Sequence, residues 1–213
     1  MKNDISYTIG LLSLLLGVSL LTIYLTDKYI LTAGFYISNG DIFDESPVQE
    51  ILIYQNLQKW IYFFSAVYLI IKVGVISILL SSALYLNDLK VSFRRIVNLV
   101  IVSELIFLIP AIVKIIHFYD IPGGINKASW NRFYFLSALQ LFGEVPADWT
   151  LMFQSLNIFE ISYWFLLALG IHRLSNLSYD RSLRIVLISY VPALCVWIVT
   201  VTFCSVMLFP QNG

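Results

Sequence analysis

The chain has 213 residues, of which 59% are hydrophobic and 12% are charged. A soluble domain carries about 25% charged residues, so this composition excludes an ordinary soluble domain and indicates a membrane protein. The 13 basic and 13 acidic residues cancel, and a balanced chain has no global field that would attract nucleic acid. The sequence therefore predicts that the chain contacts a lipid bilayer and has no nucleic-acid partner.

Five long apolar stretches occupy most of the chain, at residues 7–25, 61–86, 96–118, 157–175 and 185–209. A helix rises about 1.5 Å per residue, so roughly 20 residues cross a hydrocarbon core that is ~30 Å thick. The stretches lack the alternation of barrel strands, and helices are the other structure that satisfies its backbone in lipid. We predict an all-α, polytopic bundle of five transmembrane helices that forms one integral membrane domain over residues 1–213.

The charges between the stretches predict an orientation. The two short turns are basic: Lys90, Arg94 and Arg95 stand against Asp88, and Arg173, Arg181 and Arg184 stand against Asp180. An excess of Lys and Arg marks the cytoplasmic side of a membrane. The first long loop is acidic, and the second has Lys127 and Arg132 as its bases. The pattern predicts a cytoplasmic N-terminus and an external C-terminus. We expect the membrane to be a bacterial-type inner membrane.

Each long loop also contains apolar residues at helical spacing. In the first loop, Val48, Ile51, Leu52 and Trp60 follow an acidic segment at residues 41–47; in the second, Trp130, Phe133, Tyr134 and Leu141 follow a turn at residues 122–124. Both patterns predict short external amphipathic helices.

A cation site formed by Tyr36, Asp41, Asp44 and Glu45 is a weaker interpretation than a solvated acidic loop, because their spacing is not that of a calcium loop.

Aromatic and basic residues gather near the predicted external boundary of the bilayer. The candidate interfacial residues are Trp60, Lys114, His117 and Trp130. An aromatic belt explains the tryptophans, and a lysine near a helix end snorkels to the interface. The alternative is a face that contacts lipid headgroups or an external partner.

Three ionisable residues, Lys72, Glu104 and Glu160, lie inside the apolar stretches and form the candidate intramembrane polar site. Charged groups in lipid are costly and normally pair or mark a pathway. If Leu86 and Leu174 are taken as the cytoplasmic ends of their helices, Lys72 and Glu160 each lie 14 residues from those ends, so they are predicted to pair. Glu104 would lie about 9 Å shallower than Lys72, which predicts a strained pair. Structural pairing is favoured over a proton or substrate pathway.

Enzymatic motifs are missing from the sequence. It contains no Gly-rich phosphate loop, no His-Glu-x-x-His helix and no Gly-x-Ser-x-Gly turn. The two histidines, His117 and His172, are expected at opposite faces of the membrane and could not bind one metal together. We predict a protein that is not an enzyme and that uses no metal or cofactor.

The second to fifth stretches resemble the Yip-domain family. The residues that carry the resemblance are the basic turn from Lys90 to Arg95 that leads to Pro110, and, in the closing half, Glu160, Tyr163-Trp164, Gly170-Ile171 and the run from Arg184 to Pro192. It covers about 150 residues and implies five helices with the N-terminus inside. The Asp-Leu-Tyr-Gly-Pro signature of eukaryotic members is absent.

The sequence predicts an organising or accessory subunit of a membrane complex, with a membrane-protein partner or a second copy of itself. Small residues that would allow helices to approach closely are Gly74, Ala83, Ala168 and Gly170. The alternative function is a small transporter or lipid-handling protein. Its cavity would be lined by Lys72, Glu104 and Glu160, with Pro110 and Pro192 kinking its walls.

Overall fold

The structure, a computed structural model, describes residues 2–32, 35, 47–119, 127–142, 145–146 and 149–208. All regular elements in these residues are helices, and the one strand-like feature among them is an isolated bridge between Ser137 and Asn157. The predicted all-α class is confirmed. The predicted acidic segment at residues 41–46, the candidate cation ligands Tyr36, Asp41, Asp44 and Glu45, and the turn at residues 122–124 lie outside the described residues.

Within the described residues, four helical segments are long and apolar enough to cross a membrane, as expected of a membrane protein. They are Ile5–Tyr29, Asn56–Leu86, Phe93–Phe118 and Tyr179–Cys204. The first lies in α1 (Lys2–Tyr29), the second in α3 (Pro47–Leu86) and the fourth in α10 (Tyr179–Leu208). The third comprises α4 (Phe93–Glu104), the short 3-10 helix η1 (Leu105–Phe107) and α5 (Leu108–Phe118).

The predicted fifth span forms α9 (Ile158–Ser175), which is not among these four segments. With 18 residues it is short for a crossing, and it carries Glu160, His172 and Arg173. A separate short helix, α8 (Thr150–Ser155), precedes it. The count of five crossing helices is therefore not confirmed by the helices themselves.

The predicted external helices do not form as expected. Residues 48–60 are not a separate surface helix, because they form the start of the continuous 40-residue helix α3. Neither glycine nor proline separates them from the apolar stretch, so adding residues to the existing helix is easier than ending it and nucleating another. In the second loop the single predicted helix is divided into α6 (Lys127–Arg132) and α7 (Ala138–Phe142). Leu136, which has a φ of 54°, lies in the segment between them.

Pro110 explains why the third apolar segment is interrupted. Proline has no N–H group, and its ring clashes with the carbonyl of the residue four positions earlier, here Ile106. The chain adopts the tighter 3-10 geometry over Leu105–Phe107, directly before α5. This change in geometry follows Glu104 and includes Phe107, both of which contribute to the candidate site.

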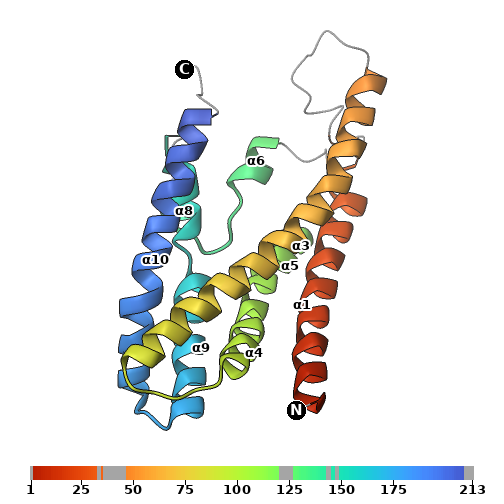
Figure 1. The fold of residues 1–213 in the computed structure, drawn as a ribbon. Coiled ribbons are helices and arrows are strands. Elements are labelled where there is room, and N and C mark those ends of the chain that lie inside the picture. Colours follow the sequence, from red (N-terminus) through yellow and green to blue (C-terminus); the bar gives the residue numbers. More distant parts are fainter. Residues whose placement is uncertain are drawn as a thin grey trace.

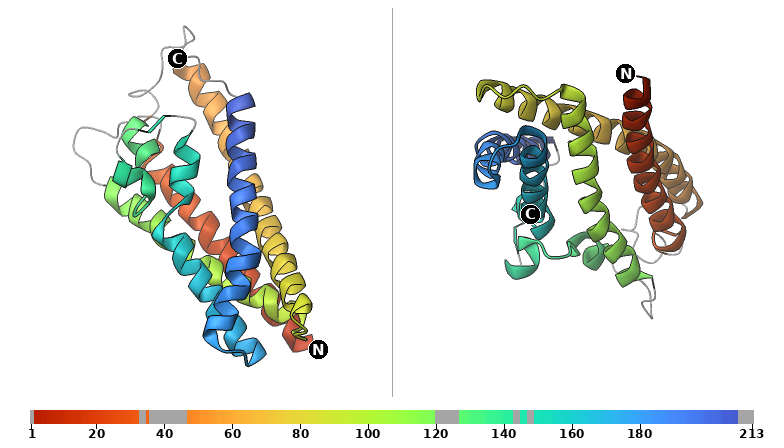
Figure 2. Two further views of the ribbon diagram at one scale, coloured as in Figure 1. Left: turned by 90° about the vertical axis from the view of Figure 1, so that its left-hand side faces the viewer. Right: turned by 90° about the horizontal axis from the view of Figure 1, so that it is seen from below.

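The long helices place both short turns and the N-terminus at one end of the bundle, which we call the N-terminal end. The α3–α4 turn and the α9–α10 turn lie there, whereas α6, α8 and the C-terminus lie toward the opposite, far end (Figure 1). Helices α1 and α10 lie on opposite sides of α4 and α5 (Figure 2, right). At the far end, the Tyr62 hydroxyl donates a 2.6 Å hydrogen bond to Asp27, which links α3 to α1.

The core lies between α3, α4, α9 and α10, toward the N-terminal end. The core residues with no exposed surface are Leu80, Ile96, Val100, Tyr163, Leu167, Ala168, Ile171 and Val186. Of the small residues predicted at helix contacts, Gly170 allows α9 to approach α4 closely, because a Cβ there would overlap the side chain of Leu99. Ala168 is buried and Ala83 packs against the core, but Gly74 has open space where its Cβ would lie.

We expect Gly170→Ala to destabilise the bundle by about 1–3 kcal/mol, because the added methyl group must displace Leu99 from a packed interface. Gly74→Ala is the matched control and should be neutral or stabilising, since its methyl group meets no atom within 4 Å and alanine favours helix. Thermal unfolding in detergent, followed by helical circular dichroism, measures both. Equal unfolding midpoints for the two variants would show that Gly170 is not a site of close helix contact.

Candidate functional site

Lys72 and Glu104 form an ion pair between α3 and α4. The Lys72 ammonium donates a 2.8 Å hydrogen bond to Glu104 Oε2. The Glu104 side chain is 2% exposed and that of Lys72 is 23% exposed, so the carboxylate depends on the lysine far more than on solvent. The Lys72 ammonium also lies 4.1 Å from the centre of the Phe107 ring, a cation–π contact that holds the charge against an apolar wall.

The predicted partner of Lys72 is thus wrong, because Lys72 bonds to Glu104 and not to Glu160. The prediction compared depths by counting residues from helix ends, which assumes parallel helices. Helix α3 is strongly inclined to its neighbours (Figure 1), so each of its residues contributes less depth than the 1.5 Å rise. Helix α4 also begins at Phe93, earlier than expected. Both differences bring Lys72 and Glu104 to a similar level.

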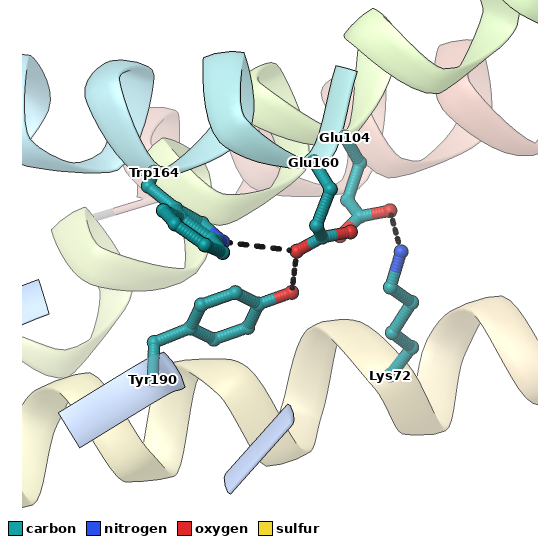
Figure 3. A network of polar contacts seen from close by, with 5 residues as sticks. All are labelled: Lys72, Glu104, Glu160, Trp164 and Tyr190. Atoms are coloured by element: carbon teal, nitrogen blue, oxygen red, sulfur yellow. Dashed lines mark hydrogen bonds and ion pairs between the residues drawn. The ribbon is translucent and has the colours of Figure 1, made fainter. Parts of the chain in front are cut away.

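Glu160 lies in the same cluster but is held by other donors. Its Oε1 atom accepts a 2.7 Å hydrogen bond from the Tyr190 hydroxyl and a 3.2 Å bond from the Trp164 indole (Figure 3). Glu160 is 7% exposed and occupies the first turn of α9, where the helix dipole favours negative charge. The side chain of Asn157 caps this turn by accepting from the Glu160 amide at 2.9 Å.

Aromatic rings enclose the charged groups. Phe107 and Tyr163 have ring centres 5.2 Å apart, and Tyr163 and Tyr190 have ring centres 5.5 Å apart. Within this cluster, Glu104 Oε1 and the Tyr163 hydroxyl are buried polar atoms that have no hydrogen-bond partner in the described part of the chain. The three predicted residues of the intramembrane polar site therefore gather in one place, enclosed by packed aromatic side chains.

Three of the four predicted interfacial residues form a second cluster, around the end of α5. The Lys114 ammonium lies 4.0 Å from the centre of the Trp130 ring and 4.9 Å from that of Tyr134. His117 stacks on Phe133 with ring centres 4.3 Å apart. The structure thus joins Lys114, His117 and Trp130. The fourth residue, Trp60, is 59% exposed on α3 and stacks with Phe64 of the same helix.

A break between α8 and α9 lies beside this second cluster. Leu156 and Asn157 leave the helical conformation, with φ and ψ values of −84° and 89° and of −136° and 162°. Residues that follow α6 pair with the backbone groups that have no helical partner at the break. Ala138 N donates to Leu156 O at 2.8 Å, and Ile158 N donates to Leu136 O at 3.1 Å. The backbone groups at the break are therefore paired within the protein.

Two pockets border the helix break, and Asn157 lines both of them. The first, of about 420 Å³, is the Lys114 pocket, and its lining includes Phe107, Pro110, Lys114, Phe133, Ser155 and Phe159. The second, of about 470 Å³, includes Leu136, Leu141, Asn157, Glu160 and Trp164. Phe107 lines the first pocket and also contacts Lys72, so this one ring separates the Lys114 pocket from the ion pair.

Sequence reasoning missed three residues that build the site: Asn157, Phe107 and Tyr190. Asn157 had a readable signal, because an Asn three residues before a Glu is a common way to begin a helix. Phe107 and Tyr190 gave none, since an aromatic residue in an apolar stretch usually faces lipid or core. Their roles depend on which helices are neighbours.

The chain was compared with protein families, with curated proteins and with solved structures, and the geometry of the site is the main guide to its function. No protein-family profile, no curated protein and no solved structure matches this chain.

A double-mutant cycle tests the pairing. Lys72→Met should lower stability by about 3–5 kcal/mol, because it leaves the Glu104 carboxylate buried without its counter-ion. Adding Glu104→Gln should recover part of that loss, with a coupling energy of about 1–3 kcal/mol. The cycle of Lys72→Met with Glu160→Gln is the control and should show weaker coupling, since Glu160 has Tyr190 and Trp164 as donors. Stronger coupling to Glu160 would refute the assignment.

Proposed function

We propose that this protein is a non-enzymatic integral membrane protein of five crossings that acts as an organising or accessory subunit of a membrane complex. Its arrangement would be the one that the resemblance to Yip-domain proteins implies. The N-terminal end of the bundle, with its two basic turns, would face the cytoplasm of a bacterial-type inner membrane. The observation that carries the proposal is the closed ion pair of Lys72 and Glu104, in which the two side chains are in direct contact and the Lys72 ammonium lies against the Phe107 ring.

The closed ion pair supports a structural role for the intramembrane charges. A transport path needs groups that exchange partners as a substrate or proton passes. Lys72 instead makes a 2.8 Å contact with a carboxylate that is almost completely buried, and Glu160 is held by two other side chains. Fixed pairing of this kind joins α3 to α4 and α9 to α10, which suits a bundle that keeps one shape.

An open face of α1 supports a partner in the membrane. Gly10 and Gly17, one heptad apart on this helix, are exposed. Apart from the adjoining residues and backbone of α1, no atom of the described residues lies within 4 Å of where their Cβ atoms would be. Ser13 lies exposed between them. Small residues let another helix approach closely in lipid. Leu14 and Leu21, each 52% exposed, flank this small-residue face, so its partner would be an apolar transmembrane helix.

The fifth crossing is proposed from α8 and α9 together. Both short turns lie at the N-terminal end of the bundle (Figure 1), so the chain must return to that end between α5 and α10. Helix α9 provides 18 residues of this return and α8 provides six. A broken helix can cross because the loop around Leu136 satisfies its backbone at the break.

Cysteine labelling tests the number of crossings. In a background with Cys195→Ser and Cys204→Ser, the exposed positions Lys90, Arg181 and Leu141 are each replaced by cysteine. A reagent that cannot cross membranes should label Leu141→Cys in intact cells, and should label Lys90→Cys and Arg181→Cys after the membrane is opened. A chain with four crossings would instead expose positions 141 and 181 on the same side.

Substitutions on α1 test the partner. The double variant Gly10→Leu with Gly17→Leu fills the small-residue face and should abolish a stoichiometric complex purified in mild detergent, while the unfolding midpoint stays unchanged. Gly74→Leu is the matched control, since Gly74 also lacks neighbours within 4 Å but lies on α3. The mass of the complex distinguishes a second copy from another protein. A complex that survives in the double variant would argue against α1 as the docking helix.

A second candidate function is favoured by the two pockets at the helix break. Broken helices often border binding sites in membrane transporters. The Lys114 pocket and the second pocket, whose lining includes Glu160, both border residues 156–157. This placement supports a small transporter or lipid-handling protein as the alternative.

A further inference from the structure

We propose that the Lys114 pocket binds an anionic amphiphile, an acyl chain that ends in a carboxylate or phosphate group. The ammonium of Lys114 would bind the anionic head, and the aromatic lining would bury the chain. This inference names a ligand class for the lipid-handling function, and its biological meaning rests on that proposed function. The binding itself does not depend on the number of crossings or on a partner that docks on α1.

Lys114 is a cation without an anion in the part of the chain that the structure describes. Its contacts there are the faces of the Trp130 and Tyr134 rings, at 4.0 and 4.9 Å, and no carboxylate lies within ion-pair distance. Ring faces attract the charge but do not replace a strong acceptor for its three N–H groups. Lys72 shows the difference, because it has both a ring face and a carboxylate.

The remaining lining of the pocket suits an acyl chain. Apolar side chains dominate it: Phe107, Pro110, Ala111, Phe133, Phe135, Leu151 and Phe159. Its volume of about 420 Å³ lies within the usual range for small-molecule sites. Ligands of such sites are usually held by apolar contact and oriented by a small number of polar groups.

The polar groups of the lining are largely used within the protein. The Ser137 hydroxyl donates to Tyr134 O at 2.8 Å, the Ser155 hydroxyl donates to Leu151 O at 2.8 Å, and the Asn157 amide donates to Gln154 O at 3.1 Å. Lys114 is the one charged residue among the described residues of this lining. The arrangement therefore favours one anionic head on an apolar body over a sugar or a peptide, which would need several donors and acceptors.

Contacts within the protein hold the walls of the pocket. One wall is the helix break, whose backbone is bonded to the loop at Leu136 and Ala138. Another is α5, which Pro110 and the 3-10 turn set at its angle. A site with fixed walls loses little conformational freedom when it binds, and this favours affinity.

The test is equilibrium binding of labelled ligands to the purified full chain in neutral detergent micelles. The probes are oleate, dioleoyl phosphatidate and, as the uncharged comparison, oleyl alcohol. Saturable binding of oleate, phosphatidate or both, at least tenfold tighter than oleyl alcohol, is expected. Whichever probe binds more tightly identifies the source of the anion as a free fatty acid or a phospholipid. Equal affinity for oleyl alcohol would overturn the proposal, and so would displacement of the bound probe by inorganic phosphate alone.

Four variants assign binding to the pocket. Lys114→Met should weaken binding of the anionic probe at least tenfold, whereas Lys114→Arg keeps the charge and should retain it. Ala111→Phe fills the pocket and should abolish binding. Lys59→Met is the matched control, because it removes an exposed lysine on α3, and it should bind as the parent does. Equal affinity of Lys114→Met and Lys59→Met would overturn the assignment, as would full binding by a folded Ala111→Phe variant.

Discussion

A peptide group in an apolar environment must find its hydrogen-bond partner within the protein, and this constraint underlies both the fold and the pockets. It makes the long apolar segments helical, because a helix satisfies its own backbone. At residues 156–157 the helix is interrupted, and the constraint is met instead by Leu136 and Ala138 from a distant loop. The loop is thereby held against α9, and the two pockets lie where regular packing ends.

Two lysines in apolar segments show how burial and partners give the same side chain different roles. Lys72 lies against Phe107 and is bonded to Glu104, so its charge is neutralised in the interior and joins two helices. Lys114 lies against Trp130 and Tyr134 without such a partner in the described residues. One group therefore closes the bundle, and the other is available to a ligand. Phe107, which contacts Lys72 and lines the Lys114 pocket, separates the two environments.

The membership of the polar site could be predicted, but its pairing could not. Lys72, Glu104 and Glu160 stand out because charged residues are rare in apolar stretches. Choosing between Glu104 and Glu160 required the inclination of α3, which a count of residues does not contain. Lys114 and Trp130 were predicted as separate boundary residues, and their contact depends on how the loop folds back onto α5. The role of Tyr190 as a hydrogen-bond donor to Glu160 depends on the packing of α10 beside α9.

The sequence by itself determined the all-helical class and the separation of basic turns from acidic loop, because these follow from local composition and helical rise. It predicted five crossing stretches, and four of them form helices long and apolar enough to cross a membrane in the described residues. The sequence also explains the 3-10 turn at Leu105–Phe107, because Pro110 disrupts the regular helical geometry of the residues just before it. Only the tertiary structure decided that α8 and α9 are divided at Leu156–Asn157, and which carboxylate holds Lys72. Each of these depends on contacts between segments far apart in the chain.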